Sequence, residues 1–229
     1  MNYDSRSSDL SPPNRLTLKQ RPYPQYIKYM GSKSKIMDFV LSGINEVYQG
    51  GGICDLFAGS ASLAGAIGDQ VSISSNDIQN YSATLSKAYL LAWRSSSSPD
   101  AEKIIDQAQH IFDRNKREIG WTYNYADAQE LDKFQLIEEQ EREFIDVEFT
   151  RGWHLFLKYY SGTWWSAEQA LWIDAIREVA DSYQADPAYD VILSSLMFAM
   201  AYASQGTGHY AQYRVANTVS SMRDISIYR

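Results

Sequence analysis

An α/β fold, in which a small parallel sheet unit is followed by a large helical insert, is predicted for this 229-residue sequence. Three observations lead to this prediction. Short apolar runs at 53–57 and 71–75, flanked by glycines or polar turns, have the length of buried strands. Helical apolar spacing precedes, separates and follows these two runs. Beyond a serine-rich break at 95–100, all the apolar spacing is helical.

The first part of the chain is predicted to alternate helix and strand. Residues 1–22 are rich in Ser, Pro, Asn and Arg, which predicts a flexible or extended arm. Residues 23–97 are assigned to the sheet unit. Its elements are expected in this order: a helix at 32–48 that ends at the glycines 50–52, a strand at 53–57, a helix entered through small residues at 59–66, a strand at 71–75 and a helix at 81–93.

The second part of the chain is predicted to be helical. Residues 98–215 are assigned to the insert, and residues 216–229 to the start of a return to the sheet. The helices are expected at 101–117, 126–149, 167–183 and 191–202. The last of them is apolar on most sides, which predicts a buried helix.

Composition excludes several classes of protein. With 45% hydrophobic and 21% charged residues, the chain is globular rather than disordered. The single cysteine, Cys54, excludes an internal disulfide framework, and three scattered histidines lack the spacing of a metal site. No apolar run approaches the roughly 20 residues of a membrane helix, and the polar N-terminus has no signal sequence. We therefore expect a cytoplasmic protein without a metal or a membrane partner.

The net charge of −7 is unevenly distributed. Residues 1–50 contain seven Lys and Arg against four Asp and Glu, whereas residues 99–150 contain six against fourteen. A uniformly acidic protein would be repelled by nucleic acid. Because the acidic residues are concentrated in one segment, the negative net charge of the chain is compatible with DNA binding elsewhere on the surface. The alternative is a solvated acidic helix pair with a basic tail.

The segment Asp55-Leu56-Phe57-Ala58-Gly59 ends a predicted strand and is followed by small residues and a helix. This order is typical of a nucleoside-binding turn, because small residues let the backbone approach a ligand at the helix N-terminus. The strict G-x-G-x-x-G pattern is absent, since Ala61 and Ala64 stand at its second and third glycine positions. The alternative is a tight strand-to-helix connection.

Asp77 follows the second predicted strand, 18 residues after Gly59. An acid at about this spacing accepts hydrogen bonds from the ribose hydroxyls of a bound nucleoside. The alternative is a turn, for which Asn76-Asp77 is also well suited. A phosphate-binding P-loop is excluded, because the chain contains no Gly-Lys pair.

Together with Lys28-Tyr29-Met30-Gly31-Ser32-Lys33, these segments resemble the Dam-like family of adenine-specific DNA methyltransferases. Asn76-Asp77-Ile78-Gln79 matches its acidic element, and Gly208-His209-Tyr210-Ala211-Gln212-Tyr213-Arg214 is similar to a stretch near the end of its recognition insert. The resemblance implies a Rossmann-like S-adenosylmethionine-dependent sheet, with double-stranded DNA as partner and methylation of adenine N6, as in restriction-modification.

The resemblance also implies roles for individual residues. Tyr29 and Lys33 would flank the adenine and methionine ends of S-adenosylmethionine, and Asp77 would hold its ribose. The methionine pocket would be lined by Asp55, Phe57, Ala58 and Gly59. Ala61 departs from the family pattern, and its methyl group would narrow the approach. The alternatives are a half-buried aromatic for Tyr29 and a helix-capping cation for Lys33.

The catalytic motif of that family, D-P-P-Y or a close variant, is missing. In the family an acceptor side chain and a proline carbonyl bind the adenine amino group, and an aromatic stacks on the flipped base. The only Pro-Pro pair is Pro12-Pro13, in the predicted arm. We therefore assign no catalytic residue and expect this chain alone to be inactive. Three explanations remain: a truncated enzyme, one subunit whose partner polypeptide supplies the motif, or a binding protein without catalysis.

Aromatic, basic and amide side chains gather at 150–165 and 209–214. Such mixtures suit contacts to phosphates and base edges. The candidate DNA contacts are Arg151, Lys158, His209, Tyr210, Gln212 and Arg214. The alternative is that the aromatics pack between helices. If the segment binds DNA, the acidic residues 127–148 would face away from it.

Two other classes of function stay open. An RNA or small-molecule methyltransferase would share the cofactor turn but would not need the Gly31-Ser32-Lys33 start. A helical interaction module would bind no cofactor at all.

Overall fold

The computed structural model of the chain describes residues 16–29, 31–94, 100–120, 124–150, 152, 154–206, 210 and 212–226. Most of the predicted arm therefore lies outside the described residues.

The α/β half contains two parallel strands and the helices around them. Its elements are η1 (Lys33–Ile36), α1 (Met37–Val47), β1 (Ile53–Asp55), α2 (Ser62–Ile67), β2 (Ile73–Ser75) and α3 (Asn80–Arg94). Ile53 is in register with Ile73 and Asp55 with Ser75. Parallel strands need a crossover, and α2 supplies it. The predicted strands and helices of this half are confirmed, with shorter strands.

The core of this half lies between α1 and α2, where Met37 and Leu41 pack with Leu63 and Ile67. Leu18 joins the same core at 2% exposure. The Asn45 side chain holds the backbone of Leu18 through two hydrogen bonds of 2.8 and 2.9 Å. Leu18 thus attaches residues 16–22 of the predicted arm to the α/β half, and the flexibility of the arm stays a prediction.

The second half is a helical region. Its elements are α4 (Ala101–Ile119), η2 (Tyr125–Asp127), α5 (Leu131–Arg142), η3 (Glu143–Asp146), α6 (Leu155–Tyr160), α7 (Ala167–Asp181), α8 (Ala188–Ala203) and α9 (Val219–Ser226). Its main core packs Phe112 of α4 and Leu157 of α6 against Leu171 and Val179 of α7. The single helix predicted over 126–149 is divided into η2, α5 and η3.

Residues 216–226 extend the helical region rather than the sheet. Met222 and Ile225 of α9 pack with Phe134 of α5 in a separate small core. The expected return to the sheet is therefore not formed in the described part of 216–229.

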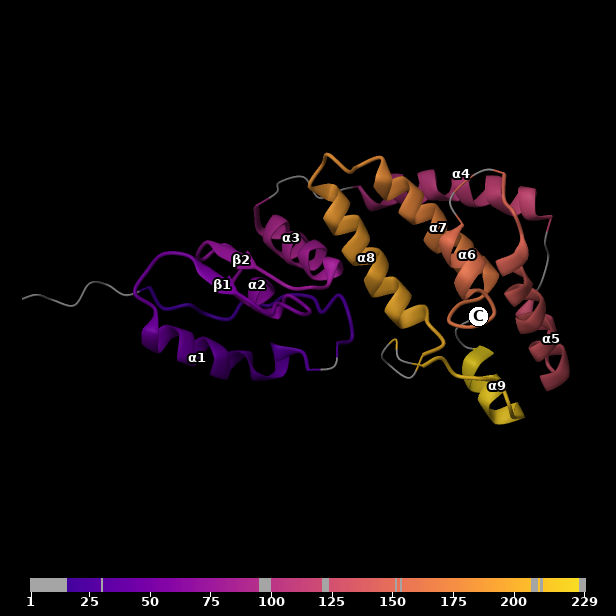
Figure 1. The fold of residues 1–229 in the computed structure, drawn as a ribbon, viewed down its shortest axis with the longest axis horizontal. Coiled ribbons are helices and arrows are strands. Elements are labelled where there is room, and N and C mark those ends of the chain that lie inside the picture. Colours follow the sequence, from indigo (N-terminus) through magenta and orange to yellow (C-terminus); the bar gives the residue numbers. More distant parts are fainter. Residues whose placement is uncertain are drawn as a thin grey trace, which may run out of the picture.

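The two halves meet where α3 packs along α8, and α8 runs between them in Figure 1. The ammonium group of Lys28 lies 4.6 Å from the ring centre of Tyr202 on α8. The prediction that α8 is buried is wrong for one face, since Phe198 is 39% and Tyr202 56% exposed. In the described part of the chain, no helix combines the length and apolar character needed to cross a membrane.

Candidate nucleoside site and nucleic-acid surface

The turn after β1 is tied to the end of β2. The amide of Ala58 donates to the carbonyl of Asn76 at 2.9 Å, and the Asn76 side chain donates to the carbonyl of Leu56 at 3.0 Å. Gly59 and Ala61 both have φ of +55°, a conformation that favours glycine. The family's glycine at the position of Ala61 is thus explained by the backbone, and alanine is held there with strain on the order of 1–2 kcal/mol.

Asp77 lies directly against this turn. One carboxylate oxygen accepts the amide of Gln79 at 3.0 Å, and the other accepts the amide of Gly59 at 2.8 Å. These hydrogen bonds, first from Gln79 and then from Gly59, lower the pKa of Asp77 below its usual value. The carboxylate therefore stays ionised and keeps lone pairs with which it can accept ligand hydroxyls.

Lys33 reaches the same place from the N-terminal motif. Its ammonium group donates to both carboxylate oxygens of Asp55, at 2.9 and 3.0 Å, and to the carbonyl of Phe57 at 2.7 Å. Asp55 is 8% exposed, whereas Phe57 is 80% exposed. The pair fixes the end of β1 and leaves the phenyl ring of Phe57 facing solvent.

Tyr29 packs against the glycine of the turn. A Cβ atom at Gly59 would lie 3.2 Å from the Tyr29 ring, so a larger residue there would displace it. Burial and the neighbouring Tyr29 hydroxyl raise the pKa of Tyr81 to about 12. The structure thus brings the predicted cofactor residues into contact, from segments up to 48 positions apart: Tyr29, Lys33, Asp55, Phe57, Ala58, Gly59 and Asp77.

No role was predicted for several other residues at this site. The hydroxyls of Ser32, Ser60 and Ser62 lie 2.8–3.1 Å from one another and join the two glycine-containing segments. Ile78, next to Asp77, is 94% exposed. The position of Ile78 directly after Asp77 could have drawn attention to it in the sequence. The serine cluster could not have been found in this way, because it forms only when the two segments meet in the fold.

The predicted DNA contacts are only partly described. Arg151 and His209 lie outside the described residues. Lys158 donates to the carbonyl of Val147 at 3.1 Å, so its ammonium group lies against η3. Gln212 and Arg214 are exposed.

Tyr210 is 47% exposed, and its ring lies 5.7 Å from that of Trp164 and 6.1 Å from that of Trp165. Burial on that side raises the pKa of its hydroxyl to about 12. Trp165 itself is buried at 3% exposure, and His154 is buried at 8%. Packing between helices therefore accounts for part of the aromatic cluster at 150–165, as the alternative interpretation held.

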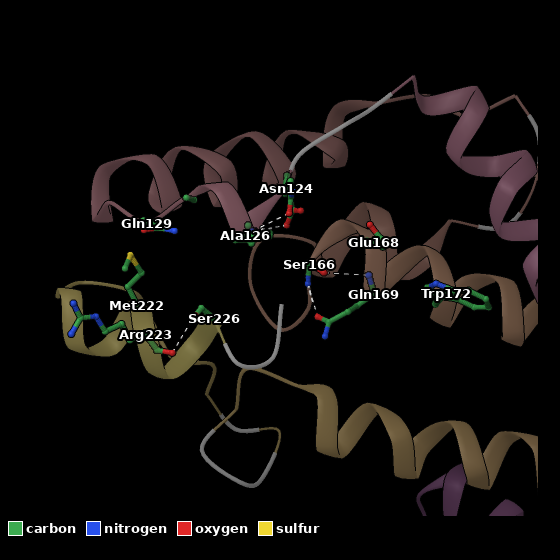
Figure 2. A pocket seen from close by; sticks show the side chains of 13 residues that line it. Asn124, Ala126, Gln129, Ser166, Glu168, Gln169, Trp172, Met222, Arg223 and Ser226 are labelled. Atoms are coloured by element: carbon green, nitrogen blue, oxygen red, sulfur yellow. Dashed lines mark hydrogen bonds between the residues drawn. The ribbon is translucent and has the colours of Figure 1, made fainter.

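A separate cavity of about 770 Å³ lies in the helical region, between η2, the start of α7 and α9 (Figure 2). Tyr125 donates to the buried Glu141 at its edge, and Ser166 and Gln169 cap α7 there. None of the predicted site residues is among the described residues that line it. The predicted nucleoside site lies instead at the turns after β1 and β2, where Phe57 and Ile78 are exposed.

The parallel strand pair has a glycine-containing first turn and an acid after the second strand, an arrangement that is also found in nucleoside-binding α/β units. The family model of D12 class N6 adenine-specific DNA methyltransferases matches residues 29–213. The chain belongs to this family, which confirms the resemblance noted from its motifs. No curated protein and no solved structure matches the chain. The two-stranded sheet is consistent with part of a methyltransferase sheet.

Proposed function

We propose that this chain is the cofactor-binding and DNA-recognition part of a site-specific DNA adenine-N6 methyltransferase. Two features support the proposal. The nucleoside-binding unit and the helical region lie side by side (Figure 1), and the family match extends over both. A cytoplasmic location is part of the proposal, because the substrate is DNA.

The residues around Asp77 suit S-adenosylmethionine, which supplies the methyl group when bound. Asp77 has an ionised carboxylate next to the turn and would accept the ribose hydroxyls. The exposed side chain of Ile78 would provide an apolar surface for the adenine, and Tyr29 would close the same end. Lys33 would lie near the methionine carboxylate of the cofactor. Among the described residues named for this site, it is the only cation, and its ammonium group is bonded to Asp55 and Phe57.

Close backbone approach is a further argument for the fit. Gly59 has a positive φ and no side chain between the turn and Tyr29. The Ser82 hydroxyl holds the Gly59 carbonyl from behind, so the turn is fixed before any ligand arrives. Phe57 and Ala58 would then line the methionine end, with Asp55 holding Lys33 in place rather than contacting the ligand.

We infer that the catalytic motif comes from a segment that pairs with the outer edge of β1. The backbone amide of Ile53 and the backbone carbonyl of Asp55 form hydrogen bonds with the β2 side. Because successive residues of a strand direct their backbone groups to opposite sides, the amide and carbonyl of Cys54 point to the other edge of β1. Among the described residues no strand pairs with that edge. Phe57, two residues beyond the end of β1, is 80% exposed and would be available for contact with such a segment. A longer chain or a partner polypeptide would supply the segment.

The hydrogen bond of 2.8 Å from Gly59 to Asp77 is the single observation that carries the proposal, because it assembles the two halves of the nucleoside site. The test is calorimetry of the 229-residue chain with S-adenosylmethionine, followed by methyl transfer from the tritiated cofactor to duplexes containing adenine. We expect binding of cofactor and duplex without turnover. Absence of cofactor binding would contradict the proposal, and turnover would show that no further segment is needed.

A further inference from the structure

Gln205, two residues beyond the end of α8, is almost completely buried at 1% exposure. Its two amide hydrogens need acceptors, because each unpaired buried donor costs on the order of 1–3 kcal/mol, whereas its side-chain oxygen has no hydrogen-bond partner among the described residues. The Gln205 side-chain nitrogen donates to the Glu138 carboxylate of α5 at 3.2 Å and to the Arg214 carbonyl at 2.6 Å. One side chain therefore joins α5 to the segment that ends the predicted recognition stretch.

The backbone of Gln205 is fixed at both ends as well. Its amide donates to the carbonyl of Trp164 at 2.8 Å, and its carbonyl accepts the amide of Arg214 at 2.8 Å. The next pair along, Gly206 and Tyr213, forms an antiparallel bridge. The two side-chain and two backbone hydrogen bonds of Gln205 thus set the register in which the segment around Gly206 pairs with the segment around Tyr213.

Helix α5 supports the same arrangement through other polar side chains. Gln135 donates to the carbonyl of Ala216 at 2.6 Å, and Arg142 donates to the carbonyl of Gly162 at 2.9 Å. Gly162 has φ of +65°, and a Cβ atom there would lie 2.2 Å from the carbonyl oxygen of Glu138. Part of the acidic segment therefore faces inward and holds the loops around Gln205, rather than forming only a solvated face.

We propose that Gln205 is a positioning residue for DNA recognition, which holds the Gly206–Tyr213 pair in the register that presents Gln212 and Arg214 outward. This inference rests on the proposed function, since it assigns a purpose to the two exposed side chains. Gln205 itself touches no ligand in this scheme. It acts through the backbone of Arg214.

The test replaces the amide by a carboxylate in Gln205→Glu. The new carboxylate would face the Glu138 carboxylate and the Arg214 carbonyl, so both donor contacts become contacts between acceptors. The matched control is Gln109→Glu, which makes the same charge change beside Asp113 on the exposed face of α4. Two readouts are taken: duplex affinity, and hydrogen exchange at the amides of Tyr213 and Arg214 in the free protein.

We expect duplex affinity to fall about tenfold or more in Gln205→Glu relative to Gln109→Glu, with exchange at the Arg214 amide accelerated by a similar factor. Cofactor affinity should remain within about twofold in both variants. Lowering the pH from about 8 to about 5.5 should restore much of the loss, because a buried carboxyl beside a like charge has a raised pKa and becomes a donor when protonated. Gln109→Glu, whose added carboxylate is exposed, should show no such recovery.

Gln205→Met, which is similar in length and has no charge, serves if the glutamate variant fails to fold. It should accelerate exchange at Arg214 without any pH recovery. Unchanged exchange in either folded variant, or equal duplex affinity of Gln205→Glu and Gln109→Glu, would overturn the inference. A wild-type chain that binds no duplex would instead refute the proposed function and, with it, the role of Gln205 in recognition.

Discussion

The helical region and the α/β half differ in how far they expose their large apolar side chains. In the helical region, Asp174 is fully buried, and its two carboxylate oxygens accept the amides of Phe156 and Leu157 at 2.9 Å each. In the α/β half, Phe57 and Ile78 are 80% and 94% exposed. The α/β half also buries a paired carboxylate, that of Asp55, but it holds the most exposed large apolar side chains of the described residues.

The same substitution in both regions gives the largest expected contrast. Phe134→Ala removes a fully buried ring from the core between α5 and α9 and should lower the free energy of unfolding by about 4 kcal/mol. Phe57→Ala removes an exposed ring and should change it by less than about 0.5 kcal/mol. Urea denaturation of both variants measures the difference. Similar losses would mean that Phe57 is covered in solution.

Asp174 makes the stability of the helical region depend on pH. Burial raises its pKa from 3.8 to about 7, against the opposing effect of the two amides. The folded protein therefore holds this proton more tightly than the unfolded chain, so the stabilisation is complete below about pH 4 and is lost as the pH rises through about 7.

The unfolding free energy of the wild type minus that of Asp174→Asn should thus fall by about 3 kcal/mol between pH 4.5 and 7.5. Because the two proteins have all other titrating groups in common, the difference between their unfolding free energies reports on Asp174 alone. A difference that rises with pH would show that the two amide hydrogen bonds outweigh burial.

Asp77→Asn tests whether the turn between Gly59 and Asp77 is a ligand site. The amide side chain has one oxygen instead of two, so it cannot both hold the turn and accept ribose hydroxyls. We expect about a tenfold loss of S-adenosylmethionine affinity by calorimetry. Asp69→Asn, which disturbs the surface ion pair with Arg21, is the control and should bind normally. Equal affinities for the two variants would remove Asp77 from the site.

Arg214→Ala gives the smallest expected effect. If the exposed Arg214 side chain contacts one phosphate, the slope of log affinity against log salt should become shallower by about 1. Lys103→Ala, on the exposed start of α4, is the matched loss of one positive charge and should leave the slope unchanged. The same slope in both variants would exclude a phosphate contact by Arg214.

Local patterns predicted much of the fold. The glycines at 50–52 and the apolar run from Ile53 correctly located the first strand, and the helical spacing located α4, α7 and α8 within a few residues. The interval between Gly59 and Asp77 was enough to place these two residues together, because parallel strands joined by a helix end on the same side of a sheet.

Burial of polar residues was not predictable in this way. Glu138 belongs to a strongly acidic segment and would be assigned to solvent from its neighbours, yet it is 4% exposed. Its partner Gln205 lies 67 positions further along the chain. Leu18 was assigned to the arm for a similar reason, since the surrounding composition is polar and its contacts come from α1 and α2.

The sequence alone determined the order of the motifs, the helix and strand periodicities and the membership of the methyltransferase family, because each is written in neighbouring residues or in fixed intervals. Only the tertiary structure decided that residues 16–22 are anchored, that 219–226 complete the helical region, and that Gln205 joins α5 to Arg214. Such outcomes depend on which polar groups find hydrogen-bond partners when distant segments meet, and that competition has no local signature in the chain.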